Sequence, residues 1–158
     1  MTGHPLEKFT FCPVCGSPLF TVNNFKSKRC QQCAFTYYAN PCSATAAFIR
    51  RTTPTGPELL IATRGKEPAK GTLDLPGGFV DMDETVEQGV LREIAEETGL
   101  NVAEPRYLFS LPNRYLYSGM VVHTIDMFFE VHVDANAEPV AADDAASLQW
   151  MPLAHIDS

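Results

Sequence analysis

The stretch GGFVDMDETVEQGVLREIAEETGL, Gly77 to Leu100, holds seven carboxylates and one arginine. Its Gly-Gly start indicates a bend, and the part after this bend has the residues that begin and end a helix. Thr85 and Gln88 match the capping box, and Gly99 stands where a helix-ending glycine is expected. The stretch therefore predicts a bent loop followed by a helix from Thr85 to about Thr98.

The expected helix collects its negative charge on one side. Each residue advances about 100° around the axis, so Glu93, Glu96 and Glu97 share an arc of about 100°. The apolar residues of the adjoining arc can bury against a sheet; they are Val90, Leu91 and Ile94. Clustered carboxylates weaken a helix unless cations neutralise them, and hard oxygen ligands favour Mg²⁺ or Mn²⁺. A solvated glutamate-rich face is the alternative that this helix alone leaves open.

Gly89 and Arg92 each predict a specific contact of this helix. A glycine inside a helix costs about 1 kcal/mol relative to alanine, so we expect another group to pack closely against Gly89. Arg92 lies one turn before Glu96, and its guanidinium can hold a carboxylate as a two-pronged fork.

The charge of the whole chain is concentrated in the same stretch. The net charge is −7, of which −6 falls between Gly77 and Leu100. This balance argues against a general electrostatic grip on nucleic acid or on an anionic membrane. No apolar run approaches the roughly 20 residues needed to cross a bilayer, and MTGHPLEKFTFC lacks the features of a signal peptide. We therefore expect a cytoplasmic location.

Four of the five cysteines form two C-x-x-C pairs separated by 14 residues, namely Cys12 with Cys15 and Cys30 with Cys33. Two such pairs at this spacing predict a tetrahedral Zn²⁺ site. Two disulfides are the competing interpretation and do not suit a reducing cytoplasm. A unit of 25 to 30 residues has too small a core to fold alone, so the zinc is expected to be structural. Cys42 stands apart and is expected to be a small buried residue.

Apolar and β-branched runs predict several strands after the cysteine-rich segment. They are Ala44–Arg50, Glu58–Arg64, RYLFSL from Arg106, VVHTIDMFFEVHV from Val121 and SLQWMPL from Ser147. The segment PNRYLYSG from Pro112 is expected to be irregular. Several strands together with one internal helix indicate an α/β or α+β fold, in which helices cover a central sheet.

The same stretch matches a known family pattern. Gly78 is followed after five residues by Glu84 and after seven more by REIAEETGL from Arg92. This resembles the Nudix box, G-x5-E-x7-R-E-U-x-E-E-x-G-U with U apolar, at every defined position. The resemblance implies an α/β/α sandwich with a mixed sheet for residues 39–158, preceded by a zinc ribbon at residues 1–38. It also implies a final helix, which we expect to be truncated at Ser158.

Resemblance to Nudix hydrolases implies Mg²⁺- or Mn²⁺-dependent cleavage of a nucleoside diphosphate linked to another moiety. By the same resemblance, Glu93, Glu96 and Glu97 bind the metal with the Gly78 carbonyl. Glu93 or another carboxylate activates water, Arg92 orients the glutamates, and Glu84 supports the join between loop and helix or binds metal through water.

A zinc ribbon before a Nudix domain is similar to the NADH pyrophosphatase subgroup. That subgroup carries S-Q-P-W-P-F-P-x-S, whereas this chain has SLPNRYLYS from Ser110, which leaves NADH, ADP-ribose and related compounds open. The further candidates for substrate contact are Arg64, Arg114, Tyr115 and Tyr117, and those for a general base are Asp143 and Asp144. A homodimer is compatible with the resemblance. The competing functions are a non-catalytic ADP-ribose or nucleotide sensor and a nucleic-acid-binding zinc ribbon.

Overall fold

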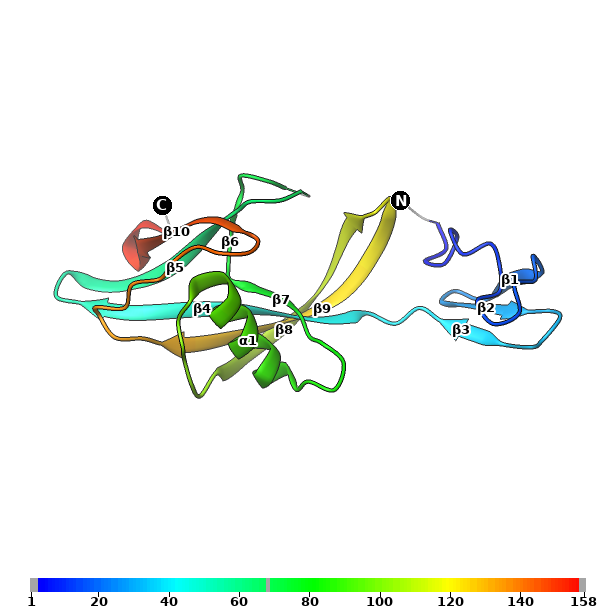
Figure 1. Ribbon diagram of the computed structural model, residues 1–158, viewed down its shortest axis with the longest axis horizontal. Helices are drawn as coiled ribbons and strands as arrows, with labels where there is room; N and C mark the ends of the chain where they lie inside the picture. The colour runs from blue at the N-terminus through cyan, green and yellow to red at the C-terminus, as the bar shows by residue number, and fades with distance from the viewer. Residues whose placement is uncertain (1–2, 68, 157–158) are drawn as a thin grey trace. The chain divides into compact units, whose positions relative to one another are not determined.

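The computed structural model describes residues 3–67 and 69–156, and the chain divides into two compact units. The first contains the N-terminal segment up to Pro41 together with Arg114–His123, and the second contains Cys42–Asn113 and the chain from Thr124 onward. Figure 1 labels the elements of each unit. No helix of the described residues has the length and apolar content to cross a membrane.

The N-terminal segment folds as a three-stranded antiparallel sheet in the order β1-β2-β3. Its strands are β1 (Phe20–Asn24), β2 (Ser27–Cys30) and β3 (Thr36–Tyr38). The buried apolar cluster of this unit is small and consists of Cys12, Phe20 and Cys30, with Phe35 packed against it. Burial on this scale contributes little free energy of folding, so a metal would have to supply much of it.

The second unit is built on a mixed sheet in the order β10-β5-β4-β9-β8. Strand β4 pairs in parallel with β9 and antiparallel with β5, while the short strands β6 and β7 pair with β5 and β4. The elements are β4 (Cys42–Thr53), β5 (Gly56–Arg64), β6 (Leu73–Asp74), β7 (Gly77–Phe79), α1 (Val86–Thr98), β8 (Arg106–Tyr117), β9 (Met120–His132), β10 (Ala145–Pro152) and η1 (Leu153–His155).

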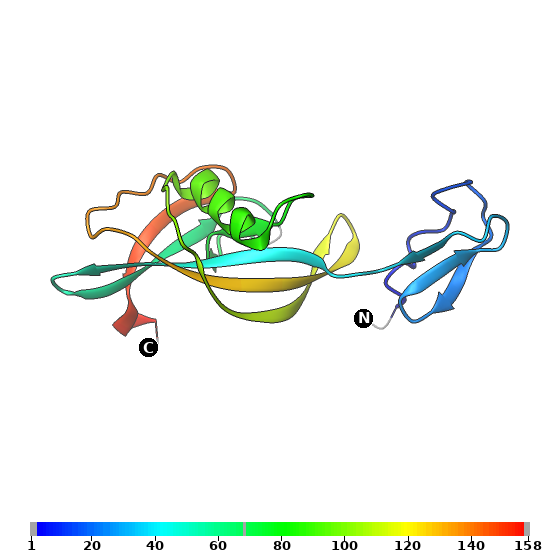
Figure 2. The same cartoon turned by 90° about the horizontal axis from the view of Figure 1, so that it is seen from below.

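Helix α1 begins and ends as the sequence predicts. Thr85 is its N-cap, the capping box with Gln88 is formed, and Gly99 ends it in the left-handed conformation with φ of 68°. Val90 and Ile94 are fully buried on the sheet, with Leu91 packed beside them. Figure 2 shows α1 (green) over one face of the sheet and the segment between β9 and β10 (orange) beside it.

The mixed sheet and the helix confirm the expected fold class. Within residues 3–67 and 69–156, α1 is the one α-helix, and the chain after β10 forms the short 3-10 helix η1. Among the described residues, the acidic helix α1 thus forms one helical layer of the expected sandwich, on one face of the sheet.

Two expectations about local structure are wrong. The segment from Pro112 is not irregular, because β8 continues to Tyr117 and turns directly into β9. Ser118 and Gly119 have φ of 49° and 74°, the conformation of a two-residue type I′ hairpin. Cys42 is exposed and not buried, because it is the first residue of β4 and precedes the buried positions of that strand.

Candidate functional site

Arg92 connects the loop before α1 to the helix itself. Its Nε and Nη2 atoms donate to the two carboxylate oxygens of Glu84, both at 2.9 Å. Nη2 also donates to the Phe79 carbonyl at 2.9 Å, and Nη1 donates to Glu93 at 2.7 Å and to Glu96 at 3.1 Å. The two-pronged fork forms on Glu84, and with Asp81 at 3.5 Å from Nε the guanidinium contacts four carboxylates instead of one.

Glu84 is the residue of the loop before α1 that accepts the two-pronged hydrogen bond from Arg92. Besides the fork, it accepts a hydrogen bond from the Asp81 N–H at 2.9 Å. The hydrogen bonds from Arg92 hold the pKa of Glu84 below its usual value. A Cβ at Gly89 would lie 3.1 Å from Glu84 Oε2 and 3.3 Å from Val80 Cγ2. The expectation that a group packs closely on Gly89 is thus confirmed.

Glu97 is buried, with 8% of its surface exposed. Its Oε2 accepts a hydrogen bond from the Gly77 N–H at 3.1 Å, and no cation of the described residues pairs with it. Burial raises the pKa of Glu97 to about 7, and the negative charges of Glu93, Asp144 and Asp74 add to the rise against the hydrogen bond from Gly77. A negative charge held in this place is unfavourable until a cation joins it.

Both glycines before the helix lie in close contact with other groups, and at Gly77 that group is main chain. Strand β7 pairs with β4, so a Cβ at Gly77 would collide with the Thr45 carbonyl. A Cβ at Gly78 would lie 2.6 Å from the Glu93 carboxyl group. Burial also raises the pKa of Glu93, although Arg92 partly offsets this effect. The main chain at Gly78 therefore lies directly against one of the helix carboxylates.

The donor atoms on this side of α1 fit a hard divalent cation. They are all oxygens, namely the carboxylates of Glu93, Glu96 and Glu97 and the carbonyl of Gly78, and the pKa values of the half-buried Glu93 and the buried Glu97 are raised. In the described chain their oxygens do not gather within 4.8 Å of one another, a closeness that only the four ribbon cysteines reach. Arg92 holds Glu93 and Glu96 by hydrogen bonds instead.

Asp143 and Asp144 lie in a turn attached to the end of α1. The Val140 and Ala142 N–H groups donate to the carbonyls of Thr98 and Glu97 at 2.9 and 3.1 Å. The charge of Asp143 raises the pKa of Glu93, and that of Asp144 raises the pKa of Glu97. These two candidate bases therefore lie near the acidic face.

The sequence analysis missed Lys66, whose Nζ pairs with Asp144 and lies 3.6 Å from Asp143. It also missed Thr45, whose hydroxyl donates to the Gly78 carbonyl at 3.5 Å. Both contacts join residues more than 30 positions apart. No local pattern in the sequence signals contacts of this kind.

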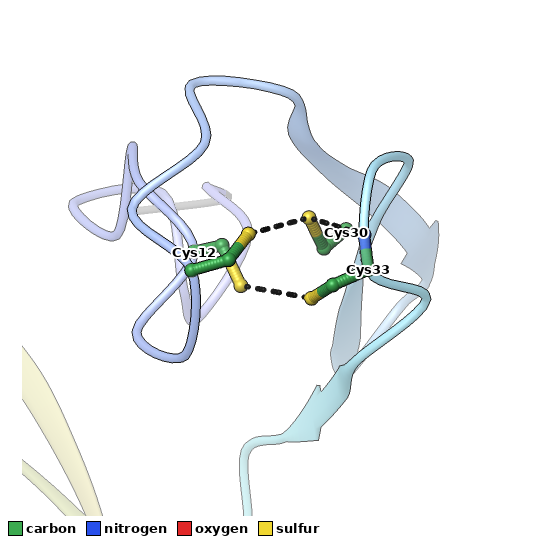
Figure 3. Close-up of side chains that lie close together, drawn as sticks. Cys12, Cys30 and Cys33 are labelled. Carbon is green, nitrogen blue, oxygen red and sulfur yellow. Dashed lines mark hydrogen bonds between the residues drawn. The ribbon is translucent and has the colours of Figure 1, made fainter.

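The four ribbon cysteines converge on one point (Figure 3), with all four Sγ atoms within 4.8 Å of one another. The Sγ atoms of Cys12 and Cys33 are 3.7 Å apart, and those of Cys15 and Cys30 are 3.6 Å apart. Zinc–sulfur bonds of about 2.3 Å give tetrahedral edges of about 3.8 Å, so the spacing fits Zn²⁺. The Cys33 N–H donates to Cys30 Sγ and lowers the pKa of Cys30 to about 6, which favours the thiolate.

The candidate substrate contacts fall in different units. Arg64 ends β5 and pairs with Asp74 at 3.0 Å. Arg114, Tyr115 and Tyr117 belong to the hairpin that groups with the N-terminal segment. Their contact with a substrate stays a prediction.

A family model described as NUDIX domain matches residues 41–158, and the chain therefore belongs to this family. The chain is 33% identical over 116 residues to the NAD-capped RNA hydrolase NudC of Deinococcus radiodurans, a match that covers 73% of this chain and 41% of that protein. It is also 33% identical over 120 residues to the protein of the same name from Haemophilus influenzae strain PittGG, covering 75% of this chain and 44% of that protein. The chain thus spans less than half the length of these curated relatives.

A solved structure shares the fold at lower identity. The NUDIX domain of Shewanella oneidensis NrtR, crystallised with ADP ribose, aligns with a TM-score of 0.64 and 23% identity over 75% of this chain and 77% of that chain. This likeness shows the fold alone.

Proposed function

We propose that the chain is a Mg²⁺- or Mn²⁺-dependent pyrophosphohydrolase that cleaves a nucleoside diphosphate linked to another moiety. The observation that carries this proposal is Glu97, a buried carboxylate that no cation of the described residues neutralises. It stands on the same helix as Glu93 and Glu96, and the main chain at Gly78 lies against the Glu93 carboxyl group. Such a set of oxygens suits a divalent ion that must meet a substrate rich in negative charge.

The proposed substrate class is a dinucleotide or nucleoside diphosphate sugar, represented by NADH, ADP-ribose and NAD attached to the 5′ end of RNA. The last of these is included because the two relatives are named for it. The sequence disfavours a general grip on nucleic acid, so the second unit is proposed to bind the pyrophosphate end of such an RNA. Against a non-catalytic sensor stands the hydrogen-bonded network of Arg92 with Glu84, Glu93 and Glu96.

Each residue of the box has a proposed role. Glu93, Glu96, Glu97 and the Gly78 carbonyl would hold the divalent ion, which when bound neutralises the phosphate oxygens and favours the ionised form of water. Arg92 orients Glu93 and Glu96 through its hydrogen bonds. Glu84 ties the loop to the helix through Arg92 and the Asp81 N–H. In the ribbon, Cys12, Cys15, Cys30 and Cys33 would hold a structural Zn²⁺.

The proposed reaction adds one water molecule across the pyrophosphate. The water oxygen bonds to one phosphorus, the bond from that phosphorus to the bridging oxygen breaks, and the bridging oxygen leaves with the other phosphate. A carboxylate accepts the proton of the attacking water, and the products are two phosphate monoesters. Glu93, Asp143 and Asp144 are the candidates for this base, and their amide variants distinguish them.

The test is a hydrolysis assay on NADH, ADP-ribose and an NAD-capped RNA oligonucleotide with Mg²⁺ or Mn²⁺. Mass spectrometry in ¹⁸O-labelled water should find two phosphate monoesters, one of them carrying a single label. Glu97→Gln should lower kcat by at least about 100-fold, as removal of a charge-stabilising group does. Glu87 is exposed on the same helix, so Glu87→Gln is the matched control. Intact substrate in every reaction, or normal turnover in Glu97→Gln, would contradict the proposal.

A further inference from the structure

Lys66 lies in the loop after β5 and reaches across to the turn that carries Asp143 and Asp144. Its Nζ pairs with Asp144 Oδ1 and lies 3.6 Å from Asp143 Oδ1. The neighbouring Gly65 N–H donates to the Asp144 carbonyl at 2.7 Å. A Cβ at Gly65 would lie 3.1 Å from that carbonyl oxygen, so the glycine allows the two segments to approach. The loop thus holds the turn by both main chain and side chain.

The other side of the turn is bonded to the acidic helix. Val140 N–H donates to the Thr98 carbonyl, and Ala142 N–H donates to the carbonyl of Glu97 itself. Asp143 has φ of 52°, a left-handed conformation that costs free energy for any residue with a side chain. A turn with this conformation keeps its shape only while contacts on both sides hold it.

The turn adds two negative charges to a face that is already acidic. The Ala142 N–H bond to the Glu97 carbonyl holds this turn against α1, so the carboxylates of Asp143 and Asp144 repel the like charges of Glu93 and Glu97 on that helix. Repulsion of this kind favours movement of the turn away from the helix. Among the described residues, Lys66 is the one cation that pairs with Asp143 or Asp144.

We propose that Lys66 is a positioning residue that holds the Asp143–Asp144 turn against the acidic face of α1. It acts through these two carboxylates and has no contact of its own with the reacting atoms. The inference rests on the proposed function for its effect on turnover, whereas its effects on the turn and on cation binding are independent of any substrate. The pair is solvent-exposed, so the effects are modest in size.

Two effects of opposite sign follow from this position. Removing the lysine charge lets the turn move, so a carboxylate near the reacting water is misplaced and kcat falls about five-fold while KM stays within about two-fold. The same removal makes the acidic face more negative, so Mn²⁺ should bind about two-fold more tightly. A purely structural role would weaken Mn²⁺ binding along with turnover.

The test compares Lys66→Met with Lys66→Arg and with Lys70→Met in the full chain. Methionine keeps most of the apolar stem without the charge, and arginine keeps the charge. Lys70 lies in the same loop, is exposed and has no ion pair within the described residues, so its replacement is the matched control. Turnover, Mn²⁺ binding by electron paramagnetic resonance, and hydrogen exchange of residues 140–145 by mass spectrometry are measured for each protein.

For Lys66→Met we expect lower kcat, a lower Mn²⁺ dissociation constant and about three-fold faster exchange at residues 140–145. Lys66→Arg should restore all three to near the unsubstituted protein, and Lys70→Met should change none. Unchanged exchange at residues 140–145, or Mn²⁺ binding weakened in Lys66→Met, would overturn the positioning role. If the unsubstituted protein cleaves no substrate, the proposed function fails, and the exchange and Mn²⁺ measurements still decide the role of Lys66.

Discussion

Replacing Glu97 with glutamine removes a buried negative charge and keeps an oxygen that can accept the hydrogen bond from the Gly77 N–H. The pKa of Glu97 rises from 4.5 to about 7 because the side chain is buried. A folded-state pKa above that of the unfolded chain means that the native state binds the proton more tightly. The stabilisation that this proton provides is fully present below pH 4.5 and is lost as the pH rises through about 7.

The size of this effect follows from the displacement of the pKa. A difference of 2.5 between 4.5 and about 7 corresponds to about 3 kcal/mol at most, and screening by nearby solvent reduces it to about 2 kcal/mol. Without divalent cations, the unsubstituted protein should therefore lose about 1 kcal/mol of unfolding free energy between pH 5.5 and pH 8 through this group. Glu97→Gln should lack this loss and be about 2 kcal/mol more stable at pH 8.

Urea unfolding, followed by tryptophan fluorescence, measures the stability of the compact unit that contains Glu97. Trp150 is the single tryptophan of the chain and lies in β10 of the second unit, so the signal does not report on the ribbon. The buffers are depleted of free divalent ions but contain no strong chelator, so that a zinc ion bound to the ribbon stays in place. Glu87→Gln is the control and should stay within about 0.5 kcal/mol at both pH values.

Parallel stability profiles for Glu97→Gln and the unsubstituted protein would show that Glu97 is not a destabilising buried charge. Adding Mg²⁺ at pH 8 provides a second check, because a ligand that binds the native state raises its stability by mass action. The unsubstituted protein should gain stability and Glu97→Gln should gain less. Equal gains in the two proteins would show that Mg²⁺ binds without the help of the Glu97 carboxylate.

Two further substitutions test the remaining parts of the molecule. Arg92→Lys keeps the charge, but a lysine cannot bond both oxygens of Glu84 together with Phe79, Glu93 and Glu96. We therefore expect the free energy of unfolding in urea to fall by about 2 kcal/mol and kcat to fall at least about ten-fold. Values equal to those of the unsubstituted protein would mean that the fork is dispensable. Cys30→Ser should abolish stoichiometric zinc in elemental analysis and increase hydrogen exchange in residues 20–38, while the urea midpoint reported by Trp150 stays unchanged. Retained zinc with a fully protected ribbon would contradict the four-cysteine site.

The features that the sequence predicted correctly depend on neighbours in the chain. The start of α1 follows from the Thr85 and Gln88 capping box, and its end follows from Gly99 in the left-handed conformation. The carboxylate face and the bonds of Arg92 to Glu93 and Glu96 follow from spacing along one helix, whereas the fork itself forms on Glu84, which precedes the helix. These signals lie within about two dozen residues, so the loop and helix of the candidate site could be predicted without the rest of the fold.

The features that the sequence analysis missed depend on distant segments or on strand position. Pro112 and the residues after it suggested an irregular segment. However, β8 is an edge strand of the sheet, and a proline is tolerated in an edge strand. Cys42 was expected to be buried because of its apolar character, yet it lies at the exposed start of β4. The pairing of Lys66 with Asp144 joins residues 78 positions apart, which periodicity cannot indicate.

Crystals grown with Mn²⁺ and a non-hydrolysable ADP-ribose analogue, measured at the manganese absorption edge, provide the most direct test of the acidic face of α1. We expect anomalous density bonded to carboxylate oxygens of Glu93, Glu96 or Glu97 and adjacent to the pyrophosphate of the analogue. A well-occupied analogue with no manganese density along this face, or with manganese bound elsewhere, would contradict the proposal that these glutamates hold the divalent ion.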